Sequence, residues 1–195
     1  MKLRSLVVAV FASALATVAA QAQIGLYITP EATRISNSTA DTGPFAFLGQ
    51  NSTSQMFYGA TIGGYYDFFQ STQGLHVGID VRDSIVHGNN AALNSFLVGV
   101  RFSGKPASLP FRPYFQGSVG AATSRAPTNS LHVTRATYAA FVGADYPINR
   151  HIDWRVLEIG YGSATTVSSN TVGGTSSVPS ASLLHFSTGI VFRIR

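Results

Sequence analysis

The chain contains 195 residues, of which 11% are charged and 11% aromatic, with 19 glycines, no cysteine and a formal net charge of +5. So mild a positive charge argues against nucleic acid as a partner, and the lack of cysteine excludes a small secreted domain held by disulfides. Stability must then come from a large core or from a lipid bilayer.

The N-terminus predicts a cleaved signal peptide over residues 1–22, followed by one domain over residues 23–195. A positively charged start, Met1–Arg4, precedes an alanine-rich apolar run from Leu6 to Ala20, and alanine occupies positions 20 and 22. Signal peptidase reads small residues at this spacing, so we expect cleavage before Gln23. The apolar run is short for a membrane anchor, which needs about 20 residues.

The rest of the chain alternates apolar and polar residues in eight segments. No apolar run approaches the roughly 18 residues of a transmembrane helix, so we expect none. A period of two is typical of strands with one apolar face. The segment Leu75–Ser84 is the most regular, because Leu75, Val77, Ile79 and Val81 alternate with polar residues. The eight segments are 24–35, 55–68, 75–84, 95–102, 111–119, 135–146, 152–162 and 184–195.

The last segment ends the chain, which predicts how the sheet is completed. Leu184, Phe186, Ile190, Phe192 and Ile194 share one face, and His185, Ser187, Gly189, Arg193 and Arg195 share the other. A free edge of this kind invites aggregation unless another strand pairs with it. Pairing with Ile24–Thr29 would close a barrel. The sequence therefore predicts an all-β fold, an eight-stranded antiparallel up-and-down transmembrane β-barrel.

Two segments are less regular than the others. Pro30 lowers the expectation of pairing in the second half of the first strand, since it has no N–H to donate. Trp154 breaks the alternation of the seventh segment, in which we expect Leu157 to face outward and Glu158 inward, with a β-bulge as an explanation.

The connections alternate between short turns and longer polar stretches. The turns are 70–74, 103–110 and 147–151, the long loops are 36–54 and 163–182, and shorter polar loops cover 87–92 and 124–130. In outer-membrane barrels short turns are periplasmic and long loops extracellular, so both termini are expected in the periplasm. The aromatic residues gathered toward the turns predict a girdle at that edge: Tyr66, Phe68, Phe102, Phe111, Phe115, Tyr146, Trp154 and Phe192.

The polar faces predict a charged interior. Eight strands leave a lumen only wide enough to be filled by side chains. Buried charges must be paired or hydrated, so we favour a structural salt-bridge network over a narrow gated ion path. The candidate inward charges are Asp67, Asp80, Arg82, Arg101, Arg112, Arg135, Glu158 and Arg193.

Two groups of residues resemble enzyme sites, but in neither do the side chains lie on the faces that catalysis would need. Asp80, Asp83 and His87 lie along one segment, but the two aspartates have opposite parity and should not share a face. His185 and Ser187 share a face and could use Glu158 as a third member, as in lipid A deacylases, yet they lie opposite the apolar face. We therefore expect no catalytic residue. The five histidines, His76, His87, His132, His151 and His185, lack metal-ligand spacing, so no metal or cofactor is expected either.

Four segments carry a resemblance to a known group. They are Met56–Phe68, His76–Arg82, Asp153–Val156 and Gly189–Arg193. With them the domain resembles the small eight-stranded outer-membrane barrels of Gram-negative bacteria, the class that includes OmpA-like and OmpX-like proteins. Such proteins usually end on an aromatic residue that the barrel assembly machinery reads, whereas this chain ends Ile194-Arg195.

The resemblance implies an integral outer-membrane protein with a role in envelope integrity or surface interaction. It also implies contact with outer-membrane lipid, with lipopolysaccharide and with the barrel assembly machinery, a monomeric state, and an extracellular partner through loops 36–54 and 163–182. Two alternatives remain: a narrow ion or small-solute channel, and a soluble secreted barrel like a lipocalin, whose apolar faces would line the interior.

Overall fold

In a computed structural model of the chain, the described residues are 23–40, 46–106, 108–127, 131–167 and 180–194. The predicted signal peptide, residues 1–22, lies outside them. The described residues form eight antiparallel strands and contain no helix that could cross a membrane. The strands are β1 (Gln23–Ser36), β2 (Ser54–Gln70), β3 (Leu75–Gly88), β4 (Ala91–Gly104), β5 (Arg112–Arg125), β6 (His132–Pro147), β7 (Ile152–Ala164) and β8 (Ala181–Ile194).

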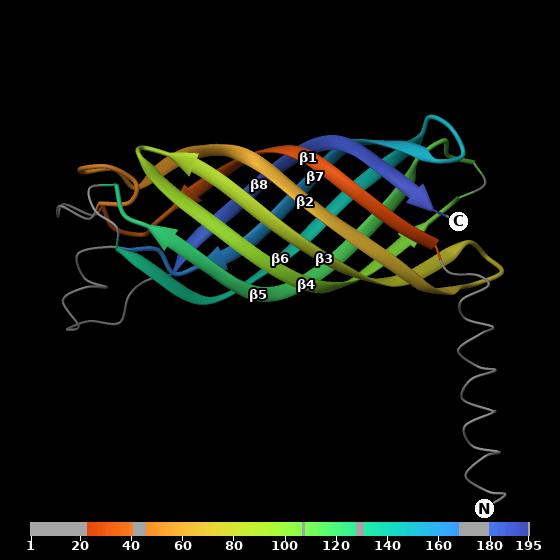
Figure 1. Cartoon of the computed structure of the whole chain (residues 1–195), viewed down its shortest axis with the longest axis horizontal. Coiled ribbons are helices and arrows are strands. Elements are labelled where there is room, and N and C mark those ends of the chain that lie inside the picture. The colour runs from red at the N-terminus through yellow and green to blue at the C-terminus, as the bar shows by residue number, and fades with distance from the viewer. Residues whose placement is uncertain (1–22, 41–45, 107, 128–130, 168–179, 195) are drawn as a thin grey trace, which may run out of the picture.

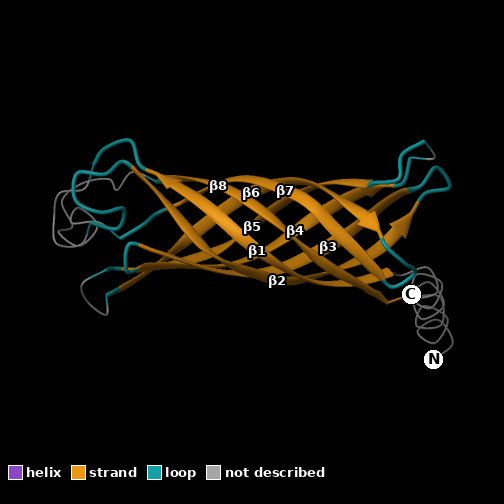
Figure 2. Ribbon diagram, turned by 90° about the horizontal axis from the view of Figure 1, so that it is seen from above, coloured by secondary structure: helices purple, strands orange, loops and turns teal. Residues whose placement is uncertain are grey.

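The strands form one closed barrel in which each strand pairs with its neighbours in the sequence (Figure 1). The last strand pairs with the first, as predicted: Ile24 lies opposite Ile194, and Ile28 lies opposite Ile190. The wall is a long cylinder in which β1 begins and β8 ends at the same end (Figure 2). The connections β2–β3, β4–β5 and β6–β7 also lie there, so we call it the turn end and the opposite end the loop end.

One connection at the loop end is tighter than predicted. The stretch 87–92 was expected to be a polar loop, but β3 and β4 extend until only Asn89 and Asn90 separate them. Both asparagines have positive φ angles, 50° and 58°. This backbone is that of a type I′ hairpin turn, whose twist matches that of the flanking strands and which asparagine tolerates well.

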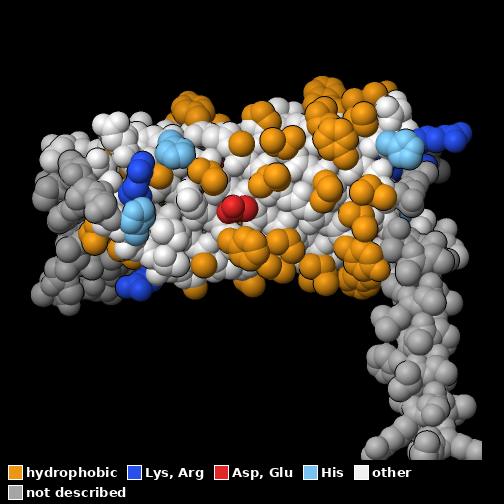
Figure 3. Space-filling view, viewed as in Figure 1, with side chains coloured by type: hydrophobic (Ala, Val, Ile, Leu, Met, Phe, Trp, Pro, Cys, Tyr) orange, Lys and Arg blue, Asp and Glu red, His pale blue; other side chains and the backbone are white. Residues whose placement is uncertain are grey.

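The outer wall of the barrel is apolar. Alternate residues of every strand point outward, and these include exposed side chains such as Leu26, Ile62, Val98 and Val119. The predicted aromatic girdle is present at the turn end, and a second set was missed. Figure 3 shows these hydrophobic side chains over one face, interrupted by an acidic side chain. The missed aromatic residues, exposed toward the loop end, are Tyr58, Phe96, Tyr138, Tyr161 and Phe186.

A bulge explains the irregular seventh segment. Asp153 and Arg155 are buried and Trp154 is exposed, but after a shift in register between Arg155 and Glu158 it is Glu158 that points inward. The predicted bulge and the inward direction of Glu158 are both confirmed. Pro30, by contrast, does not end β1, although the pairs with β8 are missing at residues 29 and 30.

Candidate functional site

The centre of the lumen is organised around Glu158. Its carboxylate accepts hydrogen bonds from Arg82 at 3.0 and 3.1 Å, Arg155 at 3.3 Å, Tyr114 at 2.6 Å and Ser187 at 3.1 Å. These five residues come from four strands, β3, β5, β7 and β8. Two guanidinium groups on one buried carboxylate supply the pairing that a charge in a narrow lumen needs.

Asp80 forms a second acceptor beside this centre. It accepts hydrogen bonds from Arg82 Nε at 3.2 Å, from Gln116 Nε2 at 2.7 Å and from the Tyr27 hydroxyl at 3.0 Å. Asp80 and Gln116 are fully buried. Arg82 therefore bridges two carboxylates, and the network reaches β1 through Tyr27.

Aromatic rings also pack on the guanidinium groups that pair with these carboxylates. A cation over an aromatic face is attracted by the ring quadrupole, and the attraction grows when water is absent. The interior thus combines ion pairs with cation–π contacts. The pairs, measured from guanidinium carbon to ring centroid, are Arg82 on Phe141 at 3.9 Å, Arg155 on Tyr27 at 4.3 Å, and Arg101 on Tyr65 and on Tyr114 at 4.0 Å each.

Toward the turn end two aspartates continue the network. Asp145 lies 2.7 Å from Arg101 Nη2 and 3.0 Å from Arg155 Nε. Asp153 lies 2.6 Å from Arg193 Nη2. All of these side chains are at most 3% exposed. These ion pairs therefore extend the charged interior toward the turn end.

Toward the loop end Glu31 is the acceptor. It lies 2.6 Å from His185 Nδ1 and accepts hydrogen bonds from the hydroxyls of Thr33 at 2.5 Å, Ser84 at 2.7 Å and Thr61. Glu31 belongs to β1 and His185 to β8, so this pair spans the junction between the first and last strands.

Above Glu31 the lumen is apolar, which corrects the expectation of a wholly polar and charged interior. Phe47 and Leu48, from the connection between β1 and β2, are 1% and 2% exposed among inward side chains of the strands. We call this cluster the apolar plug. Its members are Ile35, Phe47, Leu48, Phe57, Val86, Ala91, Leu93, Ala122, Ala164, Ala181 and Leu183.

Seven of the eight predicted inward charges face the lumen, and Arg135 does not belong to the network. It has inward parity, opposite the buried Ala122, but its side chain is exposed. The reason is local: β7 ends at Ala164, opposite Thr137, so among the described residues the first five residues of β6, 132–136, pair only with β5. The sequence alone did not show that β7 ends before it reaches the level of Arg135.

Four interior charges were missing from the prediction: Glu31, Asp145, Asp153 and Arg155. Glu31 and Asp145 have inward parity in their segments and could have been included. Asp153 and Arg155 were hidden by the bulge, because strict alternation from Glu158 would point both of them outward.

Neither enzyme constellation assembles. Asp80 is buried in the lumen while Asp83 and His87 are exposed on the outer wall. His185 contacts Glu31, whereas Ser187 donates to Glu158, so the histidine and the serine do not form a base–nucleophile pair. Among the residues that the structure describes, no group of three His, Cys, Asp or Glu side chains could hold a metal ion.

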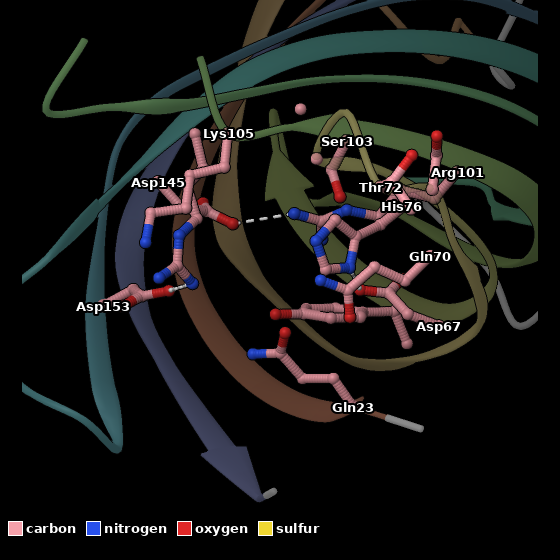
Figure 4. A pocket seen from close by; sticks show the side chains of 15 residues that line it. Gln23, Asp67, Gln70, Thr72, His76, Arg101, Ser103, Lys105, Asp145 and Asp153 are labelled. Carbon is pink, nitrogen blue, oxygen red and sulfur yellow. Dashed lines mark hydrogen bonds and ion pairs between the residues drawn. The ribbon is translucent and has the colours of Figure 1, made fainter. Parts of the chain in front are cut away.

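The turn end of the lumen is hollow. A cavity of about 690 Å³ opens inside the ends of β1 to β7 and beside the turn at residues 71–74 (Figure 4). We call this cavity the vestibule. Its ionic lining comprises Asp67, His76, Arg101, Lys105, Arg112, Asp145 and Asp153.

Comparison with known proteins shows the fold. Neisserial surface protein A matches with a TM-score of 0.56 and 14% identity over 86% of this chain and 96% of its own. The attachment invasion locus protein Ail of Yersinia pestis matches with a TM-score of 0.53 and 9% identity, over 88% and 98%. Ail in complex with the heparin analogue sucrose octasulfate gives 0.54 and 10%, over 89% and 99%.

No family model and no curated protein matches the sequence. The structural likeness is nevertheless shared over nearly the whole length of these neighbours. The chain has the architecture of the eight-stranded outer-membrane β-barrels.

Proposed function

We propose that the protein is an integral outer-membrane barrel with a structural or surface-interaction role and without catalysis. The observation that carries this proposal is the inverted distribution of side chains. Ion pairs fill the interior while large apolar residues cover the outer wall, an arrangement that is stable when the surrounding solvent is lipid. A lipocalin-like protein would need the opposite arrangement, with apolar faces inward.

The orientation follows from the connections and the termini. With the turn end in the periplasm, loops 36–54 and 163–182 face the outside of the cell and offer the surface for an extracellular partner. Part of each loop lies outside the described residues. The name of Ail, an attachment protein, and its complex with a heparin analogue illustrate the kind of surface role that this architecture supports.

The proposal includes export by the signal peptide 1–22, insertion by the barrel assembly machinery, contact with outer-membrane lipid and lipopolysaccharide, and a monomeric state. The test is expression in a Gram-negative host followed by membrane fractionation and gel electrophoresis with and without boiling. We expect the protein in the outer-membrane fraction, beginning at Gln23, with a folded form that migrates differently until heated. A protein that is soluble without detergent would refute the proposal.

A channel is the second candidate. The vestibule favours it, but the buried ion pairs of Glu158 and the apolar plug lie between the vestibule and the loop end. Planar-bilayer recording distinguishes the two candidates. We expect no single-channel steps from purified, folded protein, and reproducible steps would establish the channel.

A further inference from the structure

One flank of the outer wall carries basic side chains that a purely apolar covering does not explain. His87, Arg125 and His132 lie near the loop end of β3, β5 and β6, where all three are exposed and point outward. His87 lies opposite Ala92 of β4, and Ala92 in turn lies opposite Arg125. Arg125 lies opposite His132. We call these three side chains the basic row, and Figure 3 shows basic and histidine side chains grouped near the loop end, on the left.

The basic row has no carboxylate beside it in the described part of the chain. Its outward neighbours one step closer to the turn end include Asn94, Thr123 and Thr134, which are uncharged. The two threonine hydroxyls hydrogen-bond each other at 2.8 Å. Among the described residues Asp83 carries the one exposed carboxylate, and it lies nearer the middle of β3. Arg125 therefore has no carboxylate partner among the described residues.

The basic row lies at the outer edge of the apolar band. On β4, Phe102 belongs to the aromatic girdle of the turn end, and Ala92 lies about ten residues away along the same strand. At about 3.3 Å per residue and a strand tilt of about 40°, this separation corresponds to a height of about 25 Å. The lipid-facing band of outer-membrane barrels has the same height. Side chains that point outward from this level therefore lie among lipid headgroups.

Phosphate is the headgroup chemistry that these side chains fit. A guanidinium group donates two parallel N–H groups to one phosphate, and an imidazole ring donates a further N–H. Because Arg125 and His132 are a directly opposed pair, their side chains are close enough to donate to the same group. Ala92 faces outward beside Arg125 and is only 7% exposed, so larger side chains around it close over its methyl group.

We propose that the basic row binds the phosphate groups of a lipopolysaccharide molecule on the β3–β6 flank of the barrel. Arg125 and His132 hold one phosphate between them, and His87 extends the contact along the headgroup. The outward direction of the row selects a lipid at the side of the barrel rather than a solute above its loops. The position of that lipid in the outer leaflet rests on the proposed function, whereas the choice of phosphate and of this flank rests on the side chains themselves.

The test is an NMR titration of the refolded mature protein in uncharged detergent micelles with diphosphorylated lipid A, the lipid part of lipopolysaccharide. We expect saturable shifts of the amides of Ala92, Arg125 and His132. Lipid A without its phosphates should bind about tenfold more weakly, since a hydrogen bond to a charged group contributes about that factor. Equal binding of the two lipids, or no saturable shift, would overturn the proposal. Equal affinity for inorganic phosphate would overturn the lipid as the occupant.

Variants identify the groups involved. Arg125→Gln should weaken the binding of diphosphorylated lipid A about tenfold, and His132→Asn should weaken it by a smaller factor, with little risk to folding because both side chains are exposed. The matched control is Arg150→Gln, which removes the same charge from an exposed turn at the opposite end and should leave the affinity unchanged. Equal affinity of the Arg125→Gln and Arg150→Gln variants would refute the assignment.

Folding and location are measured separately from binding. Heat-dependent migration reports whether each variant forms the barrel. Absence of the wild-type protein from the outer-membrane fraction would contradict the proposed function, whereas a folded outer-membrane protein that does not distinguish the two forms of lipid A would contradict only the phosphate site.

Discussion

Phe47 stacks on Phe57 with ring centroids 5.1 Å apart and planes 11° from parallel. Phe57 belongs to β2, and Phe47 comes from the connection that precedes it, so this contact brings the connection down into the mouth of the barrel. Both rings are almost fully buried.

Replacing Phe47 by alanine should therefore destabilise the protein. The change removes a buried ring and leaves a cavity in the apolar plug, with an expected loss of about 3 kcal/mol in the free energy of unfolding. Urea titration in lipid vesicles measures this loss. Leu109→Ala, at an exposed turn residue, is the matched control and should change stability little. Equal stability of the two variants would mean that the plug contributes nothing.

Glu158→Gln should be more damaging than its small change in shape suggests. Arg82 and Arg155 would lose their shared carboxylate and remain buried, for which we expect a cost of about 3–5 kcal/mol. The matched comparison is Tyr114→Phe, which removes one hydrogen bond to the same carboxylate and should cost less. If both variants unfold at the wild-type urea concentration, the network is not a stabilising centre.

Asp83→Leu should stabilise the barrel in a bilayer. Asp83 is exposed on the outer wall and pairs across the strands with Ile62 and Phe96, so its carboxylate faces lipid. Removing that unfavourable group should raise the free energy of unfolding by about 1 kcal/mol in vesicles. A loss of stability would show that Asp83 faces something other than lipid.

The last strand offers a test of assembly. Ile194 is 55% exposed and pairs with Ile24, and it lies next to the end of the chain, where the resemblance implies an aromatic residue. Changing Ile194 to Phe and deleting Arg195 should leave outer-membrane assembly equal or improved, as measured by the fraction of heat-modifiable protein. A clear loss of insertion would contradict the assignment of the outward face of β8.

The period of two predicted the strands and most of the interior charges, because one parity decides which residues face the lumen. It could not place Asp153 and Arg155, since a bulge reverses parity and its position depends on the neighbouring strand. It could not predict that Arg135 is exposed either, because the burial of that side chain depends on where the neighbouring strand β7 ends.

The alternation of apolar and polar residues could not predict the apolar plug or the vestibule either, for a different reason. Phe47 lies in a connection rich in polar residues, and nothing in its spacing shows that the chain turns back into the barrel. The vestibule is likewise a property of three-dimensional packing, since Asp67, Arg101 and Asp145 line it from three different strands.

The pairing of β1 with β8 has a mechanical consequence. The ladder between these strands lacks its pairs at Thr29 and Pro30, yet the Glu31–His185 contact of 2.6 Å crosses at the next position. This junction joins the first strand of the barrel to the last, so it depends on the pairing of segments that are far apart in the sequence. The Glu31–His185 contact inside the barrel thus compensates for the backbone hydrogen bonds that are missing at Pro30. It can form only when β8 pairs with β1.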